Sequence, residues 1–338
     1  MLLSVPGFIA ALVEPGIGLA GDTRHRRVVV VVGGASLAAA LVATSLAPGF
    51  LVLLVAAIAM YPASGAFVNL SQANLMDLAP HRREGNMARW VLAGSLGSVI
   101  GPLVLAGAVI AGVGWRSVFA LLAALSIGLA AGAWIVHPAA RSEDPPAGAL
   151  LRTALGSLRD REVVRWLLVL ELQDLQGDIL LGFLALYLVD VAGASRSLAG
   201  IAVAIWTLGG LAGTIWLVRA TRRLDGLRYL RISTVAASLL FPAFLLVPSV
   251  PAKLTSAAAI AALTAGWYPI AKARLFATMP GASGTAIALC ALASLLGTAI
   301  PLVVAVAATH LGLGRAMWLL MLGPLAVLAL LPRTRLRD

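Results

Sequence analysis

Eleven long apolar runs dominate the sequence and favour membrane-spanning helices over any other fold. The runs cover residues 1–20, 28–47, 50–76, 87–112, 117–136, 163–189, 197–218, 229–249, 253–277, 285–309 and 313–332. A helix needs about 20 apolar residues to cross the roughly 30 Å hydrocarbon core of a bilayer. A membrane β-strand is about half as long and alternates polar with apolar residues, and these runs do not. The pattern predicts an all-α polytopic membrane protein with eleven transmembrane helices.

The composition supports lipid as the solvent of this chain. Hydrophobic residues make up 61% of the sequence and charged residues 12%, whereas a soluble domain is about half apolar and about a quarter charged. The net charge of +11 comes from basic residues that gather in short connections between the runs, as the positive-inside rule requires. We therefore expect a lipid bilayer as partner and no nucleic acid.

The distribution of basic residues along the connections sets the predicted orientation. Of the 25 Lys and Arg residues, 21 lie on one set of alternate connections and four on the other. Since cytoplasmic loops carry the excess of basic residues, the side with 21 is predicted to be cytoplasmic. This orientation puts the C-terminus in the cytoplasm and Met1 outside. We expect a multi-pass protein of a bacterial-type inner (plasma) membrane.

The turn between the first two runs carries a charged signature. Residues 18–27 read Gly-Leu-Ala-Gly-Asp-Thr-Arg-His-Arg-Arg. The spacing resembles the loop signature of the major facilitator superfamily (MFS), membrane transporters usually built as two bundles of six helices. The matching positions are Gly18, Asp22, Arg26 and Arg27. Thr23 and His25 stand where the family has a base and a glycine.

The resemblance implies a gating role for this signature. In the family the acid approaches the cytoplasmic start of a helix in the other bundle, and here that helix would begin near Gly284 and Thr285. A carboxylate at a helix N-terminus is favoured by the free amides and by the helix dipole. We expect Asp22 to hold the cytoplasmic side closed, as a conformational contact and not as part of substrate chemistry.

The resemblance also reveals a difference in helix number. The family has twelve helices with the signature after the second, whereas here it follows the first run. We expect a truncated or misassigned start, so that the family's first helix is missing; the alternative is a genuine eleven-span protein. The predicted domains are a five-span N-terminal bundle (1–136), a cytoplasmic linker (137–162) with a short helix over 149–158, and a six-span C-terminal bundle (163–338). The fold implied is the MFS two-bundle fold, with 5+6 of the usual 12 helices.

The fourth run resembles the glycine-proline motif of exporters of the antiporter type. Its small residues Gly97 and Gly101 would let helices approach closely, and Pro102 would bend the backbone. In the third run, Tyr61 occupies the region where proton-coupled exporters often carry an arginine. The motif favours export, whereas Tyr61 departs from the family's usual proton-coupling chemistry.

Four carboxylates lie inside the apolar runs, where a charge is costly and marks a functional site. Glu171, Asp174 and Asp178 are three and four residues apart, which would place them on one face of a continuous helix. We predict that at least one of them belongs to a proton or substrate site; the alternative is structural pairing with bases on neighbouring helices. Glu14 is a further candidate proton site, although pairing with a loop arginine is the favoured interpretation.

Other polar and aromatic side chains are candidates to line a substrate cavity. They are Asn69, Gln72, Gln173, Trp206, Trp267, Tyr268 and Lys272. Packing between helices is the alternative for the aromatic residues. For Lys272 and Arg274 the alternatives are snorkelling to the interface and pairing with an acid such as Glu171.

These features predict a secondary active transporter that moves a small molecule by alternating access, with proton-coupled export as the favoured mode. An uptake symporter or a facilitator of the same fold is the alternative within transport. A non-transporting membrane sensor or assembly partner is the alternative from another class. The four histidines and the single Cys290 form no metal-binding or nucleophile motif, so we expect no enzyme activity, no metal and no cofactor. We expect a monomer.

Overall fold

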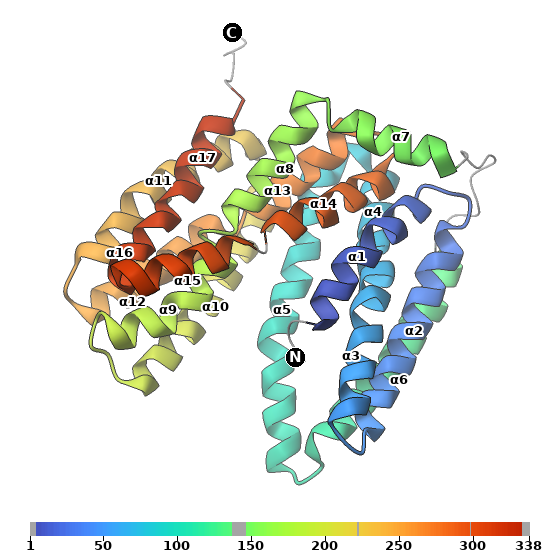
Figure 1. Ribbon diagram of the computed structural model, residues 1–338, viewed down its shortest axis with the longest axis horizontal. Coiled ribbons are helices and arrows are strands. Elements are labelled where there is room, and N and C mark those ends of the chain that lie inside the picture. The colour runs from blue at the N-terminus through green and yellow to red at the C-terminus, as the bar shows by residue number, and fades with distance from the viewer. Residues whose placement is uncertain (1–4, 137–146, 222, 298, 333–338) are drawn as a thin grey trace. The chain divides into compact units, whose positions relative to one another are not determined.

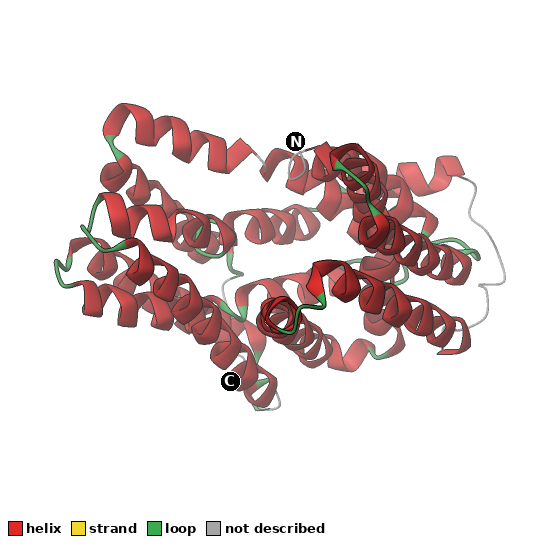
Figure 2. Ribbon diagram, turned by 90° about the horizontal axis from the view of Figure 1, so that it is seen from below, coloured by secondary structure: helices red, strands yellow, loops and turns green. Residues whose placement is uncertain are grey.

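The structure is a computed structural model that describes residues 5–136, 147–221, 223–297 and 299–332 (Figure 1). Within these residues every regular element is a helix, and Figure 2 shows helices joined by short loops. The predicted all-α class is therefore confirmed.

In the described ranges the helices follow one another as eleven spans, five of them single helices and six of them composite. The single helices are α1 (Val5–Ala20), α2 (Arg26–Leu46), α6 (Gly114–Val136), α10 (Arg196–Ala220) and α11 (Gly226–Leu246). The composite spans are α3–η1–α4 (Phe50–Ser64, Gly65–Asn69 and Leu70–Leu78), η2–α5 (Pro80–Arg82 and Arg83–Ile110), α8–α9 (Arg161–Gln173 and Asp178–Asp190), α12–α13 (Val250–Thr264 and Trp267–Thr278), α14–α15 (Ser283–Gly297 and Ala299–Leu311) and α16–η3–α17 (Leu313–Ala316, Met317–Met321 and Leu322–Leu330). Among the described residues, ten spans are long and apolar enough to cross a bilayer, and α1, with 16 residues, is shorter.

A further short helix, α7 (Ala147–Ser157), lies in the predicted linker, close to the expected range 149–158. Residues 137–146 of the linker lie outside the described residues.

The chain divides into two compact units, each built from segments that are distant in sequence. The first unit comprises Met1–His81, Ile100–Val164 and Phe276–Leu295, and the second comprises Arg82–Val99, Arg165–Leu275 and Leu296–Asp338. Helices α5, α8, α13 and α14 therefore contribute residues to both units. The division into five-span and six-span bundles on either side of the linker stays a prediction.

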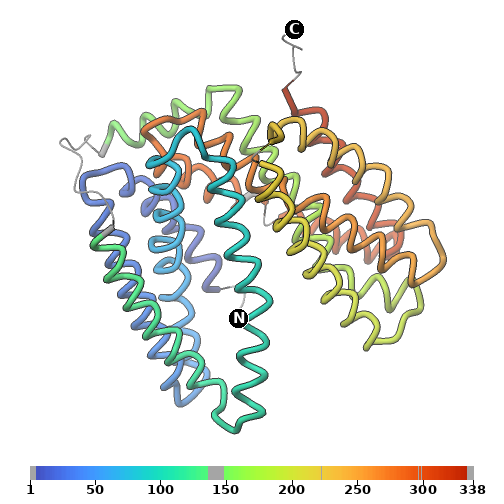
Figure 3. Tube along the Cα trace, turned by 180° about the vertical axis from the view of Figure 1, so that it is seen from behind, coloured from blue at the N-terminus to red at the C-terminus, as the bar shows by residue number. Residues whose placement is uncertain are grey.

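Close helix packing in the first unit depends on glycine. Helix α2 runs along α6 and also packs against α3 and η1 (Figure 3). A Cβ at Gly33 would lie 2.7 Å from the Ala66 Cβ, and a Cβ at Gly34 would lie 2.8 Å from the Ala130 Cβ. Ser126 Oγ donates a hydrogen bond to the Gly34 carbonyl oxygen at 3.1 Å. Small residues thus let these helices pack closely. Such packing is expected in a bilayer, because the hydrophobic effect does not drive helices together in lipid and van der Waals contact must hold them.

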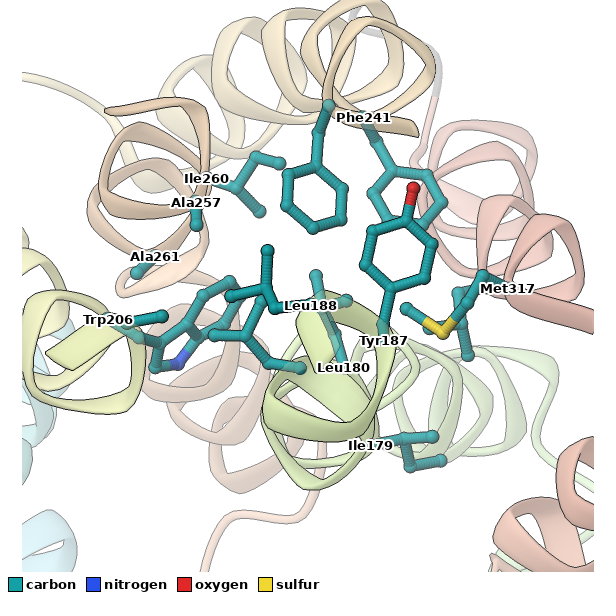
Figure 4. Packing of buried hydrophobic residues seen from close by; sticks show 14 of the residues in the cluster. Ile179, Leu180, Tyr187, Leu188, Trp206, Phe241, Ala257, Ile260, Ala261 and Met317 are labelled. Atoms are coloured by element: carbon teal, nitrogen blue, oxygen red, sulfur yellow. The ribbon is translucent and has the colours of Figure 1, made fainter. Parts of the chain in front are cut away.

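The second unit has an apolar core that draws side chains from several helices (Figure 4). Leu188 of α9, Trp206 of α10, Phe241 of α11, Ile260 of α12 and Met317 of η3 are each 7% exposed or less. Such close packing supplies the dispersion contacts that hold helices together in a bilayer.

A buried lysine caps the C-terminal end of α11. Lys253, near the start of α12, is only 3% exposed. Its Nζ donates to the carbonyl oxygens of Phe244 (2.6 Å) and Leu245 (3.0 Å) and to the Tyr187 hydroxyl (2.9 Å). The last carbonyls of a helix have no intrahelical partner and carry partial negative charge. Lys253 therefore supplies the donor that the last carbonyls of α11 lack. Because Lys253 belongs to α12 and also contacts Tyr187 of α9, it links the three helices.

A tyrosine bridges the interruption between α12 and α13. The Tyr229 hydroxyl donates to the Leu263 carbonyl oxygen at 2.8 Å and accepts from the Gly266 amide. A Cβ at Gly266 would lie 2.6 Å from Tyr229 Cζ, so the aromatic ring occupies the space of a side chain there. In a bilayer each unsatisfied backbone group costs several kcal/mol, and this hydroxyl satisfies two of them.

Among the described residues, four spans that the sequence predicts as continuous helices are interrupted. The third contains the π-helix η1, the sixth breaks between Gln173 and Asp178, the ninth breaks between Thr264 and Trp267, and the eleventh contains the 3-10 helix η3. The expectation that Glu171, Asp174 and Asp178 share one face of a continuous helix is therefore wrong. The amide of Ile179 instead donates to the Asp174 carbonyl oxygen at 3.0 Å, in a turn wider than that of an α-helix.

We predict that Lys253→Met lowers the thermal unfolding midpoint of the purified protein in detergent. Methionine keeps an unbranched side chain but donates no hydrogen bond. The carbonyl oxygens at the end of α11 then lose their donor, which lowers the free energy of unfolding by about 1–3 kcal/mol for each group left unsatisfied. Arg196→Met, at an exposed base that begins α10, is the matched control and should leave the midpoint unchanged. Equal midpoints for both variants would show that the cap does not stabilise α11.

Candidate functional site

The turn between α1 and α2 presents a buried carboxylate to the start of α14. Asp22 is 3% exposed. Its Oδ1 accepts from the Gly284 amide at 2.8 Å, and its Oδ2 accepts from the amide and the hydroxyl of Thr285, both at 2.6 Å. These are first-turn amides with no intrahelical partner, and the helix dipole favours an anion beside them. The signature predicts a contact of Asp22 with the helix start at Gly284 and Thr285, and this contact is present.

Glycine makes this approach sterically feasible. A Cβ at Gly18 would lie 2.6 Å from the Ala288 amide nitrogen and 2.8 Å from the Gly284 carbonyl oxygen. A Cβ at Gly284 would lie 2.9 Å from the Asp22 amide nitrogen. Any side chain at either position would push α1 away from α14. The glycine of the signature therefore allows the two backbones to lie close together.

Arg26 extends the contact into a network. Its Nη2 lies 3.2 Å from Asp22 Oδ1 and 2.8 Å from Ser283 Oγ, and its Nη1 lies 2.7 Å from Asp77 Oδ2. Ser283 Oγ also donates to Asp77 Oδ2 at 2.5 Å. The guanidinium thus bridges two carboxylates, which suits its planar array of donors. We call Asp22, Arg26, Asp77, Ser283 and the amides of Gly284 and Thr285 the Asp22 network.

The second arginine of the signature has a different partner. The Arg27 guanidinium lies 4.1 Å from the centre of the Trp134 ring and donates a hydrogen bond to the Trp134 carbonyl oxygen. It therefore holds α2 against the end of α6 by a cation–π contact and a hydrogen bond.

The three acids of the sixth span lie on both sides of the break between α8 and α9. Asp174 interacts electrostatically with both Glu171 and Asp178. Gln173 Nε2 donates to Asp174 Oδ1 at 2.5 Å. The Glu171 carboxylate lies against Gly297, where an added Cβ would meet it. Asp178 is exposed and begins α9.

A buried glutamine supports the interrupted segment. Gln176 is 0% exposed, and its Nε2 donates to the Leu320 carbonyl oxygen at 3.2 Å. Its Oε1 accepts no hydrogen bond from the described part of the chain. The segment between α8 and α9 is therefore anchored to η3 by a buried polar side chain.

The other candidate cavity residues do not converge on a single site. Asn69 and Glu14 line one cavity within the first unit. Trp206 belongs to the apolar core of the second unit, and Trp267 is fully buried, with its Nε1 donating to Ser233 Oγ at 2.9 Å. These surroundings favour packing for both tryptophans.

Three further candidates differ in exposure. Gln72 and Lys272 are buried, and Tyr268 is 37% exposed. Their role in a substrate cavity stays a prediction.

The glycine-proline segment of α5 has open surroundings. No described heavy atom beyond the helix's own backbone lies within 4 Å of a Cβ built at Gly97 or Gly101. The helix nevertheless continues through Pro102 to Ile110. The packing role of Gly97, Gly101 and Pro102 stays a prediction.

Comparison with known proteins supplies the family. The family model described as Major Facilitator Superfamily matches residues 1–300, well over half of the chain. The chain belongs to the Major Facilitator Superfamily. A search among curated proteins finds no match to the sequence.

Solved MFS structures share the fold at low sequence identity. The transporter FucP in its outward conformation is 12% identical, with a TM-score of 0.81 over 97% of this chain and 88% of FucP. The human organic anion transporter MFSD10 is 23% identical, with a TM-score of 0.74 over 98% and 83%. The proton:xylose symporter XylE is 18% identical, with a TM-score of 0.70 over 97% and 85%. The MFS fold, with its multi-pass membrane architecture, is thereby confirmed.

This MFS protein carries a second ion network that sequence reasoning missed. Arg274 Nε lies 2.7 Å from Glu84 Oε1, and Arg274 Nη2 lies 2.8 Å from Asp225 Oδ1. Asp225 caps α11 by accepting from the Arg228 amide at 3.3 Å. The Glu84 carboxylate also lies at this helix start, 2.6 Å from where a Cβ of Gly226 would be. Like the Asp22 network, it places acids at a helix N-terminus and an arginine between two carboxylates.

The signals for these missed residues were weak. Asp77 and Glu84 are acids next to the basic connections, and nothing in their local spacing indicates a partner. For Arg274, the expected alternatives were snorkelling and an acid such as Glu171, whereas the acids that it contacts are Glu84 and Asp225.

We predict that Asp22→Asn speeds amide hydrogen exchange at the start of α14. Loss of the charge weakens the bonds to the amides of Gly284 and Thr285 by about 1–2 kcal/mol, which corresponds to roughly tenfold faster exchange. Hydrogen–deuterium exchange with mass spectrometry on the purified protein measures it.

A matched control is Asp225→Asn, which should speed exchange at the start of α11, where Asp225 accepts from the Arg228 amide, and leave α14 unchanged. If both variants altered both helix starts equally, the exchange would report general loosening and not loss of each cap.

Proposed function

We propose that this MFS protein is a secondary active transporter that moves a small molecule by alternating access, coupled to protons and in the direction of export. The observation that carries the proposal is the Asp22 network, in which a carboxylate of the α1–α2 turn caps α14. The two segments belong to the predicted five-span and six-span halves of the chain. A transporter of this type must break such a contact each time its cytoplasmic side opens.

The strength of the contact suits a reversible gate. A carboxylate at a helix N-terminus contributes about 0.3–2 kcal/mol, depending on burial. Asp22 is buried, so its contribution belongs near the upper part of that range. A bias of this size shifts an equilibrium between two states by about tenfold, and substrate binding can overcome it.

The proposed proton site is the acid cluster at the α8–α9 break. Asp174 lies near enough to Glu171 and Asp178 for electrostatic interaction. Carboxylates that interact electrostatically repel one another when all are ionised, which favours the uptake of a proton by one of them. Interrupted transmembrane helices are also typical of ion and substrate sites, because free backbone groups are tolerated only inside protein or beside water.

The direction of transport rests on the glycine-proline segment of α5, which resembles that of antiporters. FucP is a fucose:proton symporter, XylE is a proton:xylose symporter, and MFSD10 is an organic anion transporter. Their cargoes differ, so the fold leaves the substrate open. Uptake by symport is the alternative mode. We place the 21-base side and the C-terminus in the cytoplasm of a bacterial-type inner membrane, with the protein as a monomer.

We predict that Asp178→Asn abolishes substrate-coupled proton flux. The protein is reconstituted in vesicles with a pH-sensitive dye inside, and candidate substrates are added with and without an imposed pH gradient. Export by antiport moves protons opposite to the substrate. Proton flux in the same direction as the substrate would reject antiport in favour of symport, and flux that is absent for every substrate would reject proton coupling.

The control for this measurement is Asp190→Asn, which removes an exposed carboxylate from the last residue of α9. It should retain wild-type flux. A similar loss in both variants would show that the effect is not specific to the acid cluster.

We further predict that Asp22→Asn lowers the initial rate of transport by about tenfold while the amount of inserted protein stays the same. The reason is the lost bias toward the cytoplasm-closed state, about 1–2 kcal/mol. Quantitative membrane immunoblotting alongside the vesicle assay measures both. Normal turnover with normal insertion would remove the gating role of Asp22.

A further inference from the structure

The linker helix α7 carries an apolar stripe on its exposed side. Leu151, Leu155 and Leu158 are three or four residues apart, so they share one face of the helix and of the turn that follows it. All three are exposed, Leu155 to 58%. Ala154, next to the stripe, is only 5% exposed and is therefore covered by other parts of the chain. We call the three leucines the leucine stripe.

Two arginines flank the leucine stripe on its other side. Arg152 lies in α7, and Arg159 lies in the turn that continues the helix, where its amide donates to the Gly156 carbonyl oxygen at 3.0 Å. Successive residues of a helix are about 100° apart, which places both arginines on the side of the stripe opposite to Ala154. Both side chains are exposed. At 1.5 Å per residue they are about 10 Å apart along the helix axis.

A cavity of about 360 Å³ lies at the arginine side of α7. Beyond the neighbouring residues of the helix itself, no described heavy atom lies within 4 Å of a Cβ built at Gly148 or Gly156, so the space beside the arginines is open. The cavity wall combines two cations with apolar surface, and no acid is among the described residues that form it. These residues are Gly148, Leu151, Arg152, Leu155, Gly156 and Arg159.

The position of α7 in the chain puts it at a membrane surface. Only three residues separate Ser157, the last residue of α7, from Arg161, which begins the span α8–α9. Within the first unit, α7 runs across the direction of the spans α2 and α6 (Figure 1). A helix that lies across the spans, beside the start of a span, runs along the plane of the bilayer. Amphipathic helices in this position bury their apolar face at the boundary of headgroups and acyl chains.

An anionic phospholipid matches both parts of this surface. Its phosphate pairs with a guanidinium group by charge-assisted hydrogen bonds, and its acyl chains accept the leucine stripe. A water-soluble anion would pair with the arginines and leave the three leucines in water. An uncharged apolar partner would cover the leucines and leave the arginines without an opposite charge.

We propose that α7 is an interfacial helix that binds anionic phospholipids of the surrounding bilayer. The lipid phosphate lies in the cavity against Arg152 and Arg159, and the leucine stripe lies at the boundary of the acyl chains. The partner is the lipid surface itself. This binding site is independent of the proposed transport function, so either can fail without the other.

The first measurement tests whether the leucine stripe lies in lipid. The full-length chain with Cys290→Ala and Leu155→Cys carries one cysteine, which is labelled with the fluorophore NBD. The labelled protein is placed in nanodiscs of phosphatidylcholine and phosphatidylglycerol that are brominated on their acyl chains, because bromine quenches NBD that lies among the chains. NBD at position 155 should lose most of its emission. NBD introduced with Thr153→Cys, at an exposed residue on the opposite face, should keep its emission.

The second measurement tests the preference for an anionic lipid. Bromine is placed on phosphatidylglycerol alone or on phosphatidylcholine alone at equal mole fraction, and the two quenching values give the relative affinity of the site for the two lipids. Arg152→Gln together with Arg159→Gln should lower the affinity for phosphatidylglycerol relative to phosphatidylcholine by about fivefold for each arginine. The control Arg196→Gln, at an exposed base that begins α10, should leave it unchanged.

A conservative pair of variants separates loss of charge from loss of structure. Arg152→Lys together with Arg159→Lys keeps both charges and should retain most of the preference for phosphatidylglycerol. If the glutamine pair folds poorly, the depth measurement at position 155 and the lysine pair still decide the proposal.

The proposal is overturned if NBD at position 155 stays as bright as at position 153, because the leucine stripe would then lie in water or under another protein. It is also overturned if the glutamine pair keeps the full preference for phosphatidylglycerol, or if the lysine pair loses it. Displacement of phosphatidylglycerol by glycerol phosphate at constant ionic strength would likewise reject it, since the arginines would then bind a soluble anion.

Discussion

The constraint on which this structure depends is that a backbone amide or carbonyl group in hydrocarbon must find its partner within the protein. Continuous helices meet it without help. Where a helix ends or breaks, a particular side chain supplies the missing partner: Lys253 donates to the last carbonyls of α11, and Tyr229 joins Leu263 to Gly266. Lys253 and Tyr229 are therefore polar residues that serve the backbone where helices end or break.

Helix starts show the same principle with the opposite charge. Asp22 accepts hydrogen bonds from the first amides of α14, and Asp225 accepts one from an amide of α11. In each unit an arginine then links two acids, Arg26 in the first and Arg274 in the second. One arrangement has thus been built twice, from residues with different local sequences. Repetition of this kind agrees with a fold made of related halves.

The sequence allowed the spans, the helical class and the contact of Asp22 with Gly284 and Thr285 to be predicted. Span length follows from bilayer thickness, and the contact followed from a resemblance to a family signature. The sequence did not reveal the break before Asp178, because hydropathy is the same for a continuous and an interrupted apolar helix. It also did not reveal the pairing of Asp77 with Arg26 or of Glu84 with Arg274, because the partners lie 51 and 190 positions apart and no local spacing connects them.

The tyrosine bridge has a mechanical consequence for the ninth span. A plain interruption would leave α12 and α13 joined by bare peptide groups, and any tilt between them would expose these groups to lipid. The Tyr229 hydroxyl comes from the neighbouring helix α11 and serves both as donor and as acceptor, so one side chain pairs with backbone groups on both sides of the interruption. The ninth span is therefore interrupted without leaving the Leu263 carbonyl or the Gly266 amide unpaired, and the same span carries Arg274 beyond the break.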